Sequence, residues 1–191
     1  YEETVDSCFF NHTSRLDWGT TLAPQLIFDP ENLSSWQQLA IGQGPIKTCP
    51  LAIALNIGAV LHPDGAMLTP YLVQRITTES GKVTYENSGV EVLSVPLADA
   101  GVREALASML EATAEGYGLR FPGARVLAKT GTATIQGSDK NNVFLSFSVE
   151  TKDGKHYAGC FSREKVSGTS SQLKPIAKKL IEKILEEEKK E

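Results

Sequence analysis

Apolar and polar residues alternate along a segment in the last third of the chain. In residues 142–151 every second position is apolar: Val143, Leu145, Phe147 and Val149. Period-two alternation is typical of a strand with one buried face. A strand over residues 124–135 precedes this segment, and one over residues 157–162 follows the glycine turn at residues 152–155. Three consecutive strands with short links predict an antiparallel meander.

Helical spacing is clearest near the C-terminus, where one apolar stripe recurs at Leu173, Ile176, Ala177, Leu180, Ile181, Ile184 and Leu185. We expect this helix, capped by Ser170 or Ser171, to lie across the meander. Residues 100–114 predict a second helix with Asp99 as N-cap, whose buried stripe is Val102, Leu106, Met109, Leu110 and Thr113.

A third helix, from Pro50 to Leu61, is apolar nearly all round, which predicts a central and buried element. Proline suits its first position, and Gly58 in its middle indicates close packing against another element. The remaining predicted segments are a helix over residues 3–16 that stops at Asp17-Trp18-Gly19, a loop over 20–32, a short helix through 36–40 capped by Ser34 or Ser35, and a β-hairpin of 71–77 with 83–85.

Composition places the chain among ordinary globular domains. Its 191 residues are 41% apolar, which is enough for one sizeable core, so we expect one domain or a large piece of one. The net charge of −4, with both signs interspersed, argues against a nucleic-acid partner. The sequence contains no run of 18 apolar residues, so it predicts no membrane span. Three cysteines and three histidines are scattered, so we predict no disulfide, no metal site and no cofactor.

The stretch Ala128-Lys129-Thr130-Gly131-Thr132-Ala133 stands out within the first strand of the meander. Glycine inside a strand often marks a place where a ligand or another backbone comes close. A cation and two hydroxyls beside such a place suit an extended ligand that ends in a carboxylate. A surface lysine on a strand of β-forming threonines is the alternative explanation.

The context of Lys129-Thr130-Gly131 resembles the third signature of the serine penicillin-binding proteins and β-lactamases. Two further stretches narrow the resemblance to the class B D,D-transpeptidases. They are Leu39-Ala40-Ile41-Gly42-Gln43-Gly44, followed by Thr48 and Pro50-Leu51-Ala52, and the run from Glu115-Gly116 to Ala133. With Pro70-Tyr71-Leu72-Val73, the resemblance covers roughly residues 33–150. Ala128 stands where the family favours glycine, and Cys49 interrupts Thr-Pro.

The resemblance implies a fold and a role for each matching residue. The fold is α+β: an antiparallel meander with a C-terminal helix and a helical subdomain, as part of a penicillin-binding transpeptidase domain. Lys129 and Thr132 are the implied catalytic residues, the first through its charge and proton relay, the second through an oxyanion-hole N–H. Thr130 and Thr132 hydroxyls would bind the substrate carboxylate, and Gly131 would let the substrate backbone pair along the strand. Gln43 would line the cleft floor or order its own loop.

Two signatures that the family needs do not occur upstream of Lys129: Ser-x-x-Lys, which carries the nucleophile, and Ser-x-Asn. Literal matches at Ser162-Arg163-Glu164-Lys165 and Ser171-Gln172-Leu173-Lys174 lie downstream, in the wrong order, and we interpret them as chance, with Lys174 on the solvent side. We therefore expect residues 1–191 to be the C-terminal part of a transpeptidase domain, inactive alone because the nucleophile lies upstream in the parent protein.

Three functions remain open. The parent protein is a D,D-transpeptidase that cross-links peptidoglycan stem peptides ending in D-Ala-D-Ala and is acylated by β-lactams, or an inactive binding module of the same fold, or a β-lactamase. The resemblance implies a membrane-anchored parent on the extracytoplasmic face of the cell membrane, with a role in cell-wall synthesis and division. A sheet edge left exposed predicts self-association with a second copy.

Overall fold

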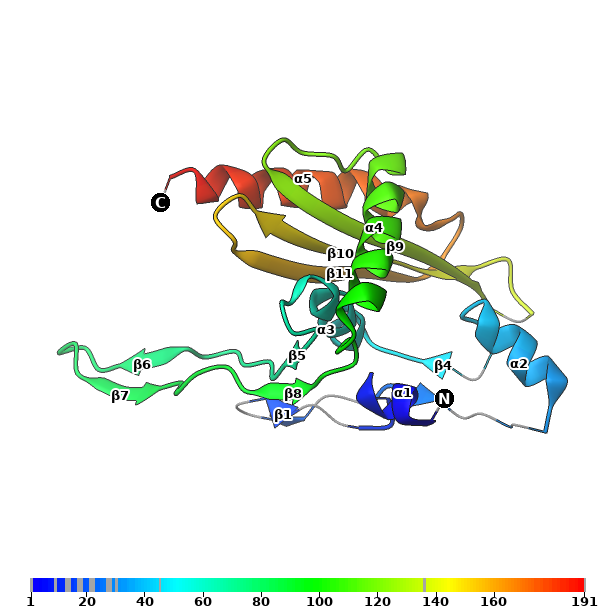
Figure 1. The fold of residues 1–191 in the computed structure, drawn as a ribbon, viewed down its shortest axis with the longest axis horizontal. Coiled ribbons are helices and arrows are strands. Elements are labelled where there is room, and N and C mark those ends of the chain that lie inside the picture. Colours follow the sequence, from blue (N-terminus) through cyan, green and yellow to red (C-terminus); the bar gives the residue numbers. More distant parts are fainter. Residues whose placement is uncertain are drawn as a thin grey trace. The chain divides into compact units, whose positions relative to one another are not determined.

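The computed structural model of the chain describes residues 2–8, 10–12, 15–16, 19–20, 23–26, 29, 31–44, 46–135 and 137–190. The chain divides into two compact units. The first consists of Tyr1–Thr48 and Ala66–Pro96, and the second of Cys49–Gly65 and Leu97–Glu191. Figure 1 labels the elements of both units, and each unit is described by itself below.

The second unit is built on the predicted meander, which is confirmed. Its strands are β9 (Ala124–Thr134), β10 (Asn141–Thr151) and β11 (His156–Val166). They form an antiparallel sheet in the order β11-β10-β9, so β9 is an edge strand. β10 lies opposite β9 in an unbroken register that places Gly131 across from Phe144. β11 is longer than predicted because pairing with β10 continues as far as Val166.

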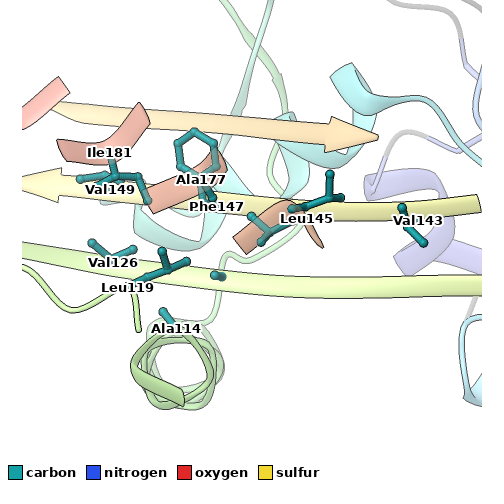
Figure 2. Close-up of a cluster of buried hydrophobic side chains, with 11 residues drawn as sticks. Ala114, Leu119, Val126, Val143, Leu145, Phe147, Val149, Ala177 and Ile181 are labelled. Carbon is teal, nitrogen blue, oxygen red and sulfur yellow. The ribbon is translucent and has the colours of Figure 1, made fainter. Parts of the chain in front are cut away.

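One face of this sheet packs against the C-terminal helix. The alternating residues of β10 are all buried there together with Leu173, Ala177 and Ile181. Figure 2 shows Val143, Leu145, Phe147 and Val149 along β10, with Ala177 and Ile181 of α5 beside them. Each such side chain contributes roughly 1.5–3 kcal/mol when fully buried. The helix starts differently from the prediction. Thr169 caps a 3₁₀ turn, η1 (Ser170–Leu173), through its side chain, and α5 (Lys174–Glu188) follows.

The opposite face carries α3 (Pro50–Leu61), while α4 (Ala100–Gly116) packs on both sides of β9, with Ala107 on this face and Ala114 in the cluster of the α5 face. Leu127 of β9 is fully buried here against Val60 of α3 and Ala107 of α4. The close packing predicted at Gly58 is present, since a Cβ there would lie 3.2 Å from the Cβ of Ala158 on β11. Proline begins α3 as expected.

The predicted stripe of α4 is wrong in part. Val102 and Met109 are 58% and 69% exposed, whereas Ala107 and Ala114 are buried. Small residues let the helix approach the sheet closely, so alanine forms the contact that periodicity assigned to larger side chains. Asp99 is the N-cap as predicted, accepting a hydrogen bond from the Val102 N–H at 2.9 Å.

The first unit contains short elements. Its helices are α1 (Glu2–Ser7) and α2 (Leu33–Ala40), and its strands pair as β1 (Arg15–Leu16) with β2 (Gly19–Thr20), β3 (Gln25–Leu26) with β4 (Ile46–Lys47), β5 (Met67–Leu68) with β8 (Val92–Ser94), and β6 (Arg75–Thr77) with β7 (Val83–Glu86). The hairpin over 71–85 is confirmed, with a shorter first strand.

The helix predicted over residues 3–16 is wrong beyond Ser7. Asn11 adopts a positive φ of 63° and exchanges hydrogen bonds with Leu26 through its side chain, which turns the chain away from a helical path. The predicted stop residues Asp17 and Trp18 lie outside the described residues. Within the predicted loop, β3 pairs with β4.

Two further observations concern the cap of α2 and the length of the helices. Asn32, rather than Ser34 or Ser35, caps α2 by accepting from the Ser34 N–H at 3.0 Å. In the part of the chain that the structure describes, no helix is long and apolar enough to cross a membrane.

Candidate functional site

Strand β9 carries four of the five predicted site residues in succession, from Lys129 to Thr132. It pairs with β10 on one side, and no other described strand pairs with its opposite side. An edge strand of this kind presents backbone N–H and C=O groups to which an extended ligand can pair.

The four side chains divide between the two faces of the sheet. Successive strand residues point to opposite faces, so Lys129 and Gly131 share a face with Leu127, on the side of α3. Thr130 and Thr132 share the other face with the core residues Val126 and Ala128, on the side of α5. Only a ligand that lies along the edge itself can reach groups from both faces.

Lys129 is exposed, and its ammonium donates to the carbonyl of Thr130 at 2.9 Å. Among the described residues, no carboxylate lies within 4.0 Å of this ammonium to form an ion pair. A lysine ammonium has three protons to donate. The remaining protons of Lys129 can therefore serve an anionic ligand at the strand edge.

The hydroxyl groups of the two threonines have partners on the α5 side. The Thr130 hydroxyl lies 2.9 Å from the Tyr117 hydroxyl at the end of α4. The Thr132 hydroxyl donates to the Ser170 hydroxyl at 3.2 Å and accepts from the Ser170 N–H at 3.1 Å. These bonds fix both threonine rotamers from behind the edge. Ser170 is 8% exposed, so its contact with Thr132 lies within the fold.

Sequence reasoning missed the residues behind the strand. The sequence patterns assign no site role to Tyr117 and predict only a helix cap at Ser170. Lys174, predicted on the solvent side, is instead half-buried with its ammonium 4.2 Å from the centre of the Tyr117 ring. Nothing in local sequence links these positions to Thr130, because the contacts join segments far apart along the chain.

Packing gives a second reason for glycine at position 131, besides the role predicted for it. A Cβ at this position would lie 2.1 Å from Cε1 of Phe144, the residue opposite on β10. The aromatic ring thus occupies the space that any side chain at position 131 would need. Gly159 on β11 shows the same arrangement, since its Cβ would lie 2.6 Å from Cζ of Phe147.

The downstream Ser-x-x-Lys matches form no serine–lysine pair. Ser162 and Lys165 lie on β11, and Lys165 has a positive φ of 53°. Ser171 lies on η1 with its N–H donating to Thr169, while Lys174 sits over Tyr117. Among the described residues no hydrogen bond joins the serine to the lysine in either match.

Gln43 lies in the first unit, in the turn after α2, where its N–H donates to the carbonyl of Gln38 at 2.8 Å. This bond is made by the backbone and does not involve the side-chain amide, so both predicted roles of that amide, in ordering the loop or lining the cleft, stay predictions. The three cysteines form no disulfide and are half-buried. No group of three or more His, Cys, Asp or Glu side chains that could hold a metal occurs among the described residues.

Comparisons with known proteins agree on a family. The model of the penicillin-binding protein transpeptidase domain matches residues 21–182. No curated protein matches the sequence significantly. Among solved structures, PBPA from Mycobacterium tuberculosis is similar with a TM-score of 0.79 at 18% identity, over 94% of this chain and 42% of that one.

Two further solved structures show the same fold. Penicillin-binding protein 2B from Streptococcus pneumoniae has a TM-score of 0.71 at 13% identity, over 95% of this chain and 31% of that one. PBP2 from Helicobacter pylori, solved in complex with MreC, has a TM-score of 0.71 at 17% identity, over 96% and 35%. The chain therefore spans less than half the length of each of these three relatives.

The match of the family model covers most of the chain, and the meander with its covering helices is the fold of these structures in part. The chain therefore belongs to the penicillin-binding protein transpeptidase domain family.

Proposed function

We propose that this chain forms one wall of the active site of a serine D,D-transpeptidase that cross-links peptidoglycan stem peptides. The observation that carries the proposal is an exposed lysine on an edge strand, with no acidic partner among the described residues. An extended peptide that ends in a carboxylate fits such an edge by strand addition and charge.

In this proposal each residue of β9 has a role. The Lys129 ammonium attracts the terminal carboxylate of the D-Ala-D-Ala peptide and takes part in proton transfer. The Thr132 N–H is one donor of the oxyanion hole, and the second donor belongs to the nucleophilic serine. Gly131 keeps the edge free of a side chain. The nucleophile lies in the part of the domain that precedes these residues, so residues 1–191 alone are inactive.

The ligand class follows from the same argument. A structure of PBPA from M. tuberculosis, solved as an imipenem acyl-enzyme complex, matches this chain with a TM-score of 0.79. We therefore include β-lactams, which carry a carboxylate beside a reactive carbonyl, among the ligands of β9. In this proposal the full-length protein is anchored in the membrane and acts on its extracytoplasmic face, in wall synthesis and division.

Covalent labelling by a fluorescent penicillin tests the proposal. The full-length protein is expected to be labelled, and residues 1–191 alone are expected to stay unlabelled. Lys129→Ala should slow labelling by about 10²–10³-fold, whereas Lys152→Ala, at an exposed turn of the same sheet, should not. A full-length protein that never labels overturns the enzymatic proposal and favours the inactive binding module. Rapid hydrolysis of nitrocefin would favour the β-lactamase.

The sheet ends in the edge strands β9 and β11, and an edge left exposed also supports self-association of the chain when it is isolated. Unpaired N–H and C=O groups on an edge strand are a template for a second copy. Light scattering should then show dimers or larger species whose fraction rises with concentration. A monomer at high concentration contradicts this expectation.

A further inference from the structure

A connected set of polar contacts lies behind the Lys-Thr-Gly strand, on the α5 face of the sheet. It runs from Lys174 at the start of α5, over the ring of Tyr117, to the hydroxyl of Thr130. Tyr117 and Thr130 are both half-buried, and the three residues come from α4, β9 and α5. The contacts therefore join three elements at one point of the proposed ligand edge.

The cation above the ring favours one direction of the Tyr117–Thr130 hydrogen bond. The Lys174 ammonium lies 4.2 Å from the ring centre. A positive charge at that distance draws electron density from the phenol and favours its oxygen as a donor rather than an acceptor. By distance alone either oxygen of this 2.9 Å contact could donate; with Tyr117 as the donor, Thr130 is the acceptor.

An accepting Thr130 keeps its own proton for a ligand. A hydroxyl has one proton to donate and two lone pairs, and a carboxylate can only accept. Thr132 differs in this respect, because its proton is donated to the Ser170 hydroxyl. The Lys129 ammonium donates a hydrogen bond to the carbonyl of Thr130, so it approaches the same residue from the other face of the sheet.

We propose that Tyr117, with Lys174 over its ring, is a positioning residue that sets the Thr130 hydroxyl to donate to the carboxylate of the ligand. This inference rests on the proposed function, because it concerns the same edge. It assigns recognition of the carboxylate to Thr130 and Lys129, and it leaves Thr132 to act through its backbone N–H.

Two matched probes test this role on the full-length protein: N-acetyl-D-alanyl-D-alanine and its C-terminal amide, with binding followed by NMR on the acetyl methyl signal of each probe. The wild type should bind the acid several-fold more tightly than the amide. Tyr117→Phe keeps the ring and removes one hydrogen bond, so it should weaken binding of the acid about three- to tenfold and leave the amide unchanged. Thr130→Val should do the same.

Lys174→Met should weaken binding of the acid in the same direction, while Lys178→Met, at an exposed position one turn further along α5, should not. Equal loss of acid and amide in Tyr117→Phe would assign a structural role only and overturn the inference. No effect of Tyr117→Phe, or no preference of the wild type for the acid, overturns it as well. Penicillin labelling of the full-length protein is independent of this titration, so either proposal can fail alone.

Discussion

Replacing Gly131 by alanine tests whether a neighbouring ring, rather than the backbone, requires glycine in the Lys-Thr-Gly strand. The backbone at this position does not have a positive φ, so alanine can adopt it. In such a case, alanine gains about 0.4–1 kcal/mol through the unfolded state. The opposing term is steric, since the added Cβ would lie 2.1 Å from Cε1 and 2.5 Å from Cζ of Phe144.

The structure gives the size of the steric term. Carbon atoms pack at roughly 3.5–4.0 Å, so the Phe144 ring must move by more than about 1 Å. Overpacking of this kind costs typically about 1–3 kcal/mol. We expect Gly131→Ala to lower the free energy of unfolding by about 1–2 kcal/mol in the wild type. In a Phe144→Ala background the ring is absent, so the same change should be neutral or stabilising by up to about 1 kcal/mol.

Denaturant unfolding of the four proteins of this cycle, followed by far-UV circular dichroism, measures the coupling between the two residues. Gly116→Ala is the matched control, because an added Cβ there meets no atom within 4 Å and the residue ends α4. It should not destabilise the protein in either background. An equal cost of Gly131→Ala with and without the Phe144 ring would refute the steric explanation.

Three further predictions concern the second unit. Ser148 is 1% exposed, and its hydroxyl has no hydrogen-bond partner among the described residues, so Ser148→Ala should raise the free energy of unfolding by about 1 kcal/mol; a loss of stability would reveal a hidden partner. Burial raises the pKa of Cys160 to about 11, so iodoacetamide at pH 8 should alkylate it about 100-fold more slowly than in the unfolded chain; equal rates contradict this. The Arg125 guanidinium hydrogen-bonds Glu104 and holds the pKa of that carboxyl below its usual range, so its stabilisation is present at neutral pH and is lost as the pH falls through the folded pKa. The Tm difference between wild type and Glu104→Gln should be constant above about pH 5 and vanish in acid. A difference independent of pH would show that the charge of Glu104 is not the cause of the stabilisation.

Periodicity predicted the elements whose partners are adjacent in sequence. The β10 alternation gave the correct buried face, because four apolar side chains at period two can be buried together only on one side of a strand. It failed for α4, where Met109 fits the helical stripe but Ala107 makes the contact. Helix spacing does not say how closely a helix approaches its neighbour. It failed again after Ser7, where the side chain of Asn11 bonds Leu26 instead of continuing the helix.

The sequence singled out the residues of the Lys-Thr-Gly strand but not the residues that contact this strand from other elements. Lys129, Thr130, Gly131 and Thr132 were found because they stand together in one strand and resemble a signature. Tyr117, Ser170 and Phe144 were not predicted as contacts of this strand, since strand register and the packing of α4 and η1 decide which side chains meet it. Their residue types are ordinary for a helix end, a cap and a strand, so no local pattern marked them.

By itself the sequence determined the three strands, the helix that covers them, and the cation, hydroxyls and glycine of the edge, because these depend on period and residue type within one segment. Only the tertiary structure decided which face each threonine takes and which groups hold its hydroxyl. It also decided that Phe144 fills the space above Gly131. Those outcomes are set by strand register and by the approach of α4 and α5, which arise when distant segments pack into one core.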